Sequence, residues 1–126
     1  MAARNARVAM GQMAFHAGSA AEEIAAAAYE HRGFAILEKR WRGEGGEIDL
    51  IARKDGVVVF IEVKKSKSFA AAASHIVASQ IKRITVSAEQ YLSTQPAGLL
   101  TEARFDAALV DSVGSVQIIP NAFDAS

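Results

Sequence analysis

The sequence predicts an α/β fold, in which a mixed central sheet is flanked by helices in the order α-β-β-β-α-β-β. Two apolar segments joined by Asp55-Gly56 predict a β-hairpin in the middle of the chain. A helical segment follows this hairpin and precedes another strand, and such a crossover favours parallel pairing of the two flanking strands. The chain has 126 residues, a length that suits one domain with a real core.

The first helix is expected to begin at a capping box. Ser19 and Glu22 have the spacing at which both side chains satisfy backbone N–H groups of the first turn. The helix continues to about Arg32, and Gly33 suits the left-handed residue that ends many helices. Residues 1–18 are then a loose N-terminal arm, or an extension of this helix, and residues 19–126 are expected to form a single domain.

The remaining elements follow from apolar runs and from residues that break them. A strand is expected over 34–41, and the glycine-rich residues 42–46 are expected to connect it flexibly to the hairpin. Later segments comprise a loop over 66–78, a helix from about Ser79 to Ser93, and strands at about 104–111 and 115–119. The helix takes its apolar positions from Ile81, Ile84, Val86, Ala88, Tyr91 and Leu92.

The hairpin turn fixes which residues face one another. Asp55-Gly56 favours a two-residue turn, because both positions need a positive φ, and Lys54 then faces Val57. The same register places Asp49 opposite Glu62 and Glu47 opposite Lys64, all on one side of the ribbon. Ile51 and Phe60 share that side, whereas Ile48, Leu50, Val57, Val59, Ile61 and Val63 fill the other. A hairpin that is apolar on both sides is expected to be covered on both.

This register brings two carboxylates together. Like charges opposite each other destabilise a sheet, so Asp49 facing Glu62 requires a cation between them. Two carboxylates and a lysine on one face are the side chains that a metal-dependent phosphodiester nuclease uses. The alternative is a solvated strand end, on which these side chains only form ordinary ion pairs.

Composition excludes several other classes of protein. The chain has no cysteine, which excludes disulfides and thiol chemistry and fits a reducing cytoplasm. No apolar run approaches the roughly 20 residues of a membrane span. The three histidines show no zinc-ligand spacing. Gly43, Gly45 and Gly46 lack the strand-loop-helix context of a phosphate-binding loop, so no small-molecule cofactor is expected.

Charge is unevenly distributed, although the formal net charge is zero. Basic residues outnumber acidic ones between Lys39 and Arg83, which suits a polyanion held against a metal. Ordinary surface charge is the alternative. The side chains expected to contact DNA phosphates are Arg40, Arg42, Lys65, Lys67, Gln80, Lys82 and Arg83. Gln80 also suits a helix cap. Phe34 and Trp41 are expected in the core, and Asp106 as a buried hydrogen-bonded residue.

Two segments of the chain resemble the YraN-like family. They are Gly-Glu-Ile-Asp-Leu-Ile-Ala-Arg at 46–53 and Phe-Ile-Glu-Val-Lys at 60–64. That family belongs to the restriction-endonuclease-like superfamily and is similar to archaeal Holliday junction resolvases. The resemblance implies a DNA endonuclease site of Asp49, Glu62 and Lys64, and places the family's first-helix glutamate at Glu22. The resemblance does not supply a substrate; structured or branched DNA is the expectation for the DNA that is cut. Related resolvases work as dimers, so the resemblance also implies a homodimer. Lys65 and Gln80 depart from residues common in the family.

Each candidate residue has an expected role. Asp49, Glu62 and the carbonyl of Val63 would bind Mg²⁺ or Mn²⁺, because hard cations prefer oxygen ligands. Lys64 would orient the attacking water or stabilise developing charge, unless it only forms a salt bridge with Glu47. Glu22 is either a site residue or a cap. A nucleic-acid-binding module without catalysis, and a protein-interaction subunit, are the rival interpretations of the whole chain.

Overall fold

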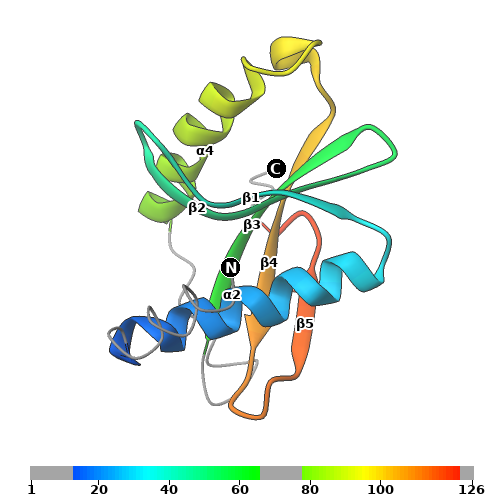
Figure 1. Cartoon of the computed structure of the whole chain (residues 1–126). Coiled ribbons are helices and arrows are strands. Elements are labelled where there is room, and N and C mark those ends of the chain that lie inside the picture. Colours follow the sequence, from blue (N-terminus) through cyan, green and yellow to red (C-terminus); the bar gives the residue numbers. More distant parts are fainter. Residues whose placement is uncertain (1–12, 66–77, 123–126) are drawn as a thin grey trace, which may run out of the picture.

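The structure, a computed structural model, describes residues 13–65 and 78–122. Within this part of the chain the elements occur in the expected order α-β-β-β-α-β-β, with a short 3₁₀ helix added (Figure 1). They are α2 (Met13–His31), β1 (Ala35–Gly43), β2 (Gly46–Lys54), β3 (Val57–Lys65), α4 (Ala78–Leu92), η1 (Gly98–Leu100), β4 (Ala103–Val110) and β5 (Val116–Ile119). Neither described α-helix is long and apolar enough to cross a membrane.

The described strands form one five-stranded sheet in the order β1-β2-β3-β4-β5. β3 and β4 are parallel, as expected for strands joined by a helical crossover, and the other neighbouring pairs are antiparallel. The mixed α/β fold predicted from the sequence is therefore confirmed.

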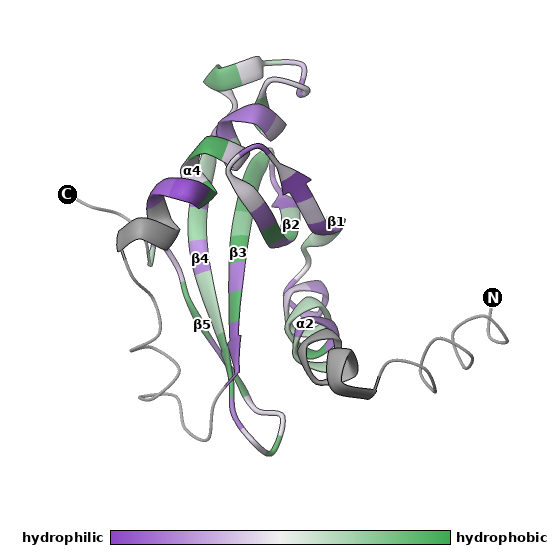
Figure 2. Cartoon of the chain, turned by 90° about the vertical axis from the view of Figure 1, so that its left-hand side faces the viewer, coloured by the Kyte–Doolittle hydropathy of each residue, from purple (hydrophilic) through white to green (hydrophobic). Residues whose placement is uncertain are grey.

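The two long helices cover opposite faces of the sheet (Figure 2). Helix α2 packs Ala25 and Tyr29 onto a core cluster that includes Leu50 and Ile61. Helix α4 packs its buried face onto a second cluster built around Phe60. Because apolar side chains of the β2–β3 hairpin enter both clusters, this hairpin is central, as its two apolar faces predicted. Val86, an apolar position of α4, is by contrast 49% exposed.

The β2–β3 turn has the predicted geometry. Asp55 and Gly56 have φ values of 53° and 80°, and Lys54 pairs with Val57. The ladder continues in this register to the pair Leu50–Ile61, where the paired residues of the two strands end. The charged residues therefore lie just beyond the regular ladder, at the end of the hairpin remote from the turn.

One side chain lies on the wrong face in the sequence-based register. The register predicts Ile48 on the other side of the sheet from Ile51, but Ile48 packs in the same cluster as Ile51 and Phe60. The strands are irregular at this point. Pairing of β2 with β3 ends at Leu50. On the other side, Leu50 and Ile48 pair with Lys39 and Trp41 of β1, and Arg40 between these two has a φ of 54°. A strict two-residue alternation does not extend through such a distortion.

The first helix begins at Met13 rather than at Ser19. Ser19 is therefore inside the helix, and the predicted capping box is wrong. The alternative that the helix extends toward the N-terminus holds for residues 13–18, while residues 1–12 lie outside the described part. Alanine and methionine favour helix in this stretch, and they override the local capping signal. The expected loop over 66–78 falls almost wholly on residues that are not described.

The connection between β1 and β2 is a tight turn, not the flexible linker expected for 42–46. Gly43 pairs with Gly46, and the turn lies against α4. The Ser87 hydroxyl donates a hydrogen bond to the Gly46 carbonyl at 2.8 Å, and the Gln90 side chain accepts one from the Glu44 N–H at 2.7 Å. A Cβ at Gly45 would collide with the backbone carbonyl of Arg83, so this close approach requires glycine.

Asp106 is buried and hydrogen-bonded, as expected. Its carboxylate accepts a 2.8 Å hydrogen bond from the Tyr29 hydroxyl and a 3.0 Å bond from Arg104 Nε. The backbone N–H of Asn121 donates a further bond at 3.1 Å. This network joins α2, β4 and the end of the described chain. Phe34 and Trp41 also pack in the core, against Tyr29 and Tyr91 respectively.

Candidate active site

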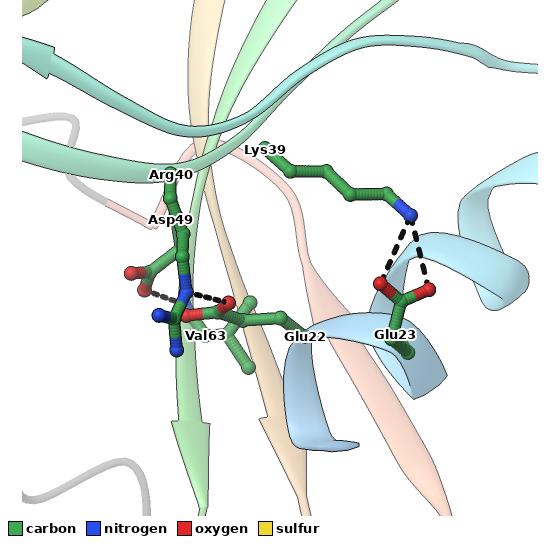
Figure 3. Close-up of polar contacts among 6 residues, drawn as sticks. All are labelled: Glu22, Glu23, Lys39, Arg40, Asp49 and Val63. Carbon is green, nitrogen blue, oxygen red and sulfur yellow. Dashed lines mark hydrogen bonds and ion pairs between the residues drawn. The ribbon is translucent and has the colours of Figure 1, made fainter. Parts of the chain in front are cut away.

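Asp49 and Glu62 are brought together at the end of the central hairpin. The Asp49 carboxylate accepts a hydrogen bond of 2.8 Å from the backbone N–H of Val63, the residue that follows Glu62 (Figure 3). This bond holds the Asp49 carboxylate across the point where the β2–β3 ladder has ended. The two carboxyl groups interact strongly enough for each to affect the titration of the other.

Both carboxyl groups are poorly solvated. Burial raises the pKa of Asp49 well above its ordinary value, and the neighbouring charge of Glu62 raises it further. Burial likewise raises the pKa of Glu62, although the ammonium group of Lys64 opposes this shift. In the absence of a cation, a proton is therefore retained at this pair more readily than at exposed carboxylates.

Lys64 lies beside the pair. Its Nζ is 3.3 Å from Oε2 of Glu62, and both side chains are largely buried. Lys64 therefore has Glu62 as its ion partner, rather than the Glu47 that the register suggested. The positive charge of Lys64 therefore lies next to the carboxylate pair.

Glu22, on helix α2, also belongs to this group of charges. Its carboxylate forms an ion pair with Arg40, with 2.6 Å between Oε1 and Nε. Burial raises the pKa of Glu22, the bond to Arg40 lowers it, and the charges of Asp49 and Glu47 raise it again. Helix α2 thus places Glu22 in the same electrostatic cluster as Asp49 and Glu62. Because the helix begins at Met13, Glu22 does not belong to a capping box at its start; its observed contact is the ion pair with Arg40.

A pocket of about 170 Å³ opens at this end of the sheet. Glu62 of β3 and Arg83 of α4 are among the residues that line it. The remaining lining residues are Gly45, Gly46, Glu47 and Ile84. This volume is large enough for a small group such as one phosphate.

Comparison with known proteins places these residues inside a family. The model described as "Uncharacterised protein family UPF0102" matches residues 21–110, which include Glu22, Asp49, Glu62 and Lys64. The chain belongs to the UPF0102 family. A UPF0102 protein of Roseobacter denitrificans is 53% identical over 118 residues, covering 94% of this chain and 92% of that protein.

Other UPF0102 proteins match over similar lengths. One from Cereibacter sphaeroides strain ATCC 17029 is 51% identical over 115 residues, covering 91% of this chain and 98% of that protein. One from Ruegeria pomeroyi is 50% identical over 107 residues, covering 85% of this chain and 87% of that protein. This chain therefore corresponds to nearly the whole length of these relatives.

The side chains expected to contact DNA are in different surroundings in this UPF0102 protein. Arg83 lines the pocket, whereas Arg40 is engaged with Glu22 inside the cluster. Arg42, Lys65 and Lys82 are exposed, on β1, at the end of β3 and on α4 respectively. Gln80 lies in the first turn of α4, and Lys67 lies outside the described residues.

The donor set suits a hard divalent cation. Within residues 13–65 and 78–122, no group of three or more histidine, cysteine, aspartate and glutamate side chains is arranged to hold a metal. Mg²⁺, however, commonly takes only one or two carboxylates and completes its shell with waters and substrate phosphate. Two adjacent, poorly solvated carboxylates and the carbonyl of Val63 fit that pattern, and they do not fit a zinc centre.

Sequence reasoning missed the residues that position α4 next to the site. Ser87 is fully buried and bonds to Gly46, and Gln90 bonds to Glu44, so the pocket wall carrying Arg83 is fixed to the β1–β2 turn. The available signal was the cluster of glycines at 43–46, since a backbone without side chains allows a helix to approach closely.

The electrostatics of the pair predict how stability depends on pH. A carboxyl group whose pKa is raised on folding stabilises the fold below its unfolded pKa, and this contribution is lost as pH rises through the folded pKa. The metal-free protein should therefore lose stability as pH increases above about 4, the ordinary carboxyl range. Asp49→Asn should show a weaker decrease, measured by urea unfolding across this range. An identical pH dependence in both proteins would contradict the assignment.

Proposed function

We propose that this UPF0102 protein is a divalent-metal-dependent endonuclease of the restriction-endonuclease-like superfamily, which hydrolyses phosphodiester bonds in DNA. The observation that carries the proposal is the pairing of Asp49 and Glu62, two poorly solvated carboxylates held together beside the ammonium group of Lys64. The mutual repulsion of two poorly solvated carboxylates costs folding energy, which a bound divalent cation would offset.

Asp49 and Glu62, together with the carbonyl of Val63, would hold Mg²⁺ or Mn²⁺. A cation bound there supplies charge neutralisation at the scissile phosphate and acidifies a bound water. Lys64 can orient the attacking water through its Nζ donors, or stabilise negative charge that develops on the phosphate. Arg83 lines the pocket and can pair with a nonbridging phosphate oxygen, because guanidinium matches phosphate geometry.

The substrate follows from charge and from resemblance. Arg42, Lys65 and Lys82 are exposed cations that can contact the DNA backbone. The likeness to archaeal Holliday junction resolvases favours structured or branched DNA and a homodimer. A cysteine-free chain acting on DNA suits the reducing cytoplasm.

A cleavage assay on a panel of DNA structures tests this function. The panel contains a four-way junction, a splayed duplex, single-stranded DNA and plain duplex, each incubated with Mg²⁺ or Mn²⁺. The protein is expected to cleave at least one of them, and most efficiently a branched one. Glu62→Gln should not cleave, whereas Glu23→Gln should, because Glu23 is exposed and pairs with Lys39 outside the cluster. DNA binding without cleavage would favour the non-catalytic binding module.

A further inference from the structure

Arg40 adopts a backbone conformation that is unusual for arginine in a strand. Its φ is 54°, in the left-handed region that residues with long side chains rarely occupy. On either side of it, Lys39 pairs with Leu50 and Trp41 with Ile48, so Arg40 lies across from Asp49. Strain of this kind persists only where the surrounding contacts hold it in place.

The Arg40 side chain enters the carboxylate cluster. Its Nε is 2.6 Å from Oε1 of Glu22, and the two side chains are only 27% and 13% exposed. In Figure 3 the guanidinium points toward the carboxylate of Glu22, and the carboxylate of Asp49 appears next to it in this view. The charges of Glu47 and Asp49 also act on Arg40. A cation that belongs to the chain is therefore already present on the α2 side of the site.

The neighbouring ion pair shows that this placement is specific. Lys39, which precedes Arg40 on β1, forms an ion pair with Glu23, which follows Glu22 on α2 (Figure 3). Their Nζ–Oε1 distance is 3.0 Å, but their side chains are 46% and 64% exposed. The Lys39–Glu23 pair is an ordinary surface pair, which contributes little to stability. The Arg40–Glu22 pair lies inside the cluster and is shielded from solvent.

We propose that Arg40 is a resident counter-ion for Glu22 and Asp49, and that it excludes a second divalent cation from the site. This inference rests on the proposed metal site of Asp49 and Glu62. A metal that bridged Glu22 and Asp49 would have to occupy the position of the guanidinium and would be repelled by its charge. The native site then takes a single divalent ion, and Glu22 acts as the partner of Arg40 instead of a metal ligand.

Arg40→Asn tests the proposal by removing the guanidinium. Asparagine tolerates the left-handed backbone better than arginine does, so this variant should keep its fold. Electron paramagnetic resonance of added Mn²⁺ counts the bound ions at saturation. We expect one ion in the parent and two in Arg40→Asn. The control Lys39→Asn and the conservative Arg40→Lys should each bind one. The double variant Glu22→Gln/Arg40→Asn should return to one, because a ligand of the second ion is lost.

The possible results separate this inference from the proposed function. Equal numbers of bound ions in the parent and Arg40→Asn would overturn the role of Arg40, as would two ions in the parent. No bound ion in the parent and one in Arg40→Asn would support exclusion by Arg40, while it would contradict the native metal site. No ion in either protein would overturn both. Circular dichroism verifies that each variant is folded.

Discussion

Lys64→Ala is expected to lose DNA cleavage by at least about 10²-fold, the usual cost of removing a group that stabilises developing charge. The lysine ammonium lies 3.3 Å from Glu62, next to the carboxylate pair. Metal binding should persist, because Asp49 and Glu62 remain. Single-turnover cleavage of the preferred DNA, measured with saturating enzyme, isolates this effect from binding.

Lys65→Ala is the matched control for this experiment. Lys65 follows Lys64 on β3 but is exposed, and it pairs with Val110 of the neighbouring strand. Its loss should weaken DNA binding modestly, because several cations share the phosphate contacts, and should leave the cleavage step intact. DNA affinity of both variants should fall steeply with salt, as counterion release requires. Full cleavage by Lys64→Ala would remove this lysine from the mechanism.

Asp49→Asn is expected to abolish most of the stabilisation that divalent metal gives the protein. A ligand that binds only the folded state stabilises it by about 2.7 kcal/mol at 100 times its Kd, which raises Tm by roughly 10 °C for a domain of this size. The parent should show a shift of this order with Mn²⁺, and Asp49→Asn only a small one. Thermal unfolding with and without Mn²⁺ measures both.

The same substitution should not harm the metal-free fold. Asp49 and Glu62 repel each other and are poorly solvated, so a neutral amide at position 49 relieves a destabilising interaction. Asp55→Asn is the matched control, since Asp55 is exposed in the turn at the other end of the hairpin. That variant should retain the full metal-dependent shift. An equal shift in Asp49→Asn would show that Asp49 is not a ligand.

Local chemistry explains why the hairpin was predictable. The Asp55-Gly56 turn requires positive φ at both positions, and this requirement fixed the register as far as Leu50–Ile61. The same register placed the charged residues at one end of the ribbon. The parallel pairing of β3 with β4 also followed from the intervening helix.

Long-range packing explains what the sequence did not reveal. The left-handed conformation of Arg40 and its pairing with Glu22 depend on how α2 lies against β1, which no local pattern encodes. The same irregular region moves Ile48 to the Phe60 side of the sheet. Ser19 and Glu22 formed a plausible cap in sequence, yet helix α2 already includes them. In each case a tertiary contact or a longer helix overrode a short signal.

We propose that Asp49 and Glu62 form a binding site for a divalent cation. When no metal is bound, a proton retained by the pair reduces the repulsion between the two carboxylates. Metal binding at such a pair must release protons, because ligating carboxylates are deprotonated. Calorimetric titration with Mn²⁺ near neutral pH, in two buffers that differ in ionisation enthalpy, measures binding and proton release together. We expect saturable binding of Mn²⁺ with release of protons in the parent, and loss of both the binding and the proton release in Asp49→Asn. Absence of binding in the parent, or the same binding and proton release in Asp49→Asn, would contradict it.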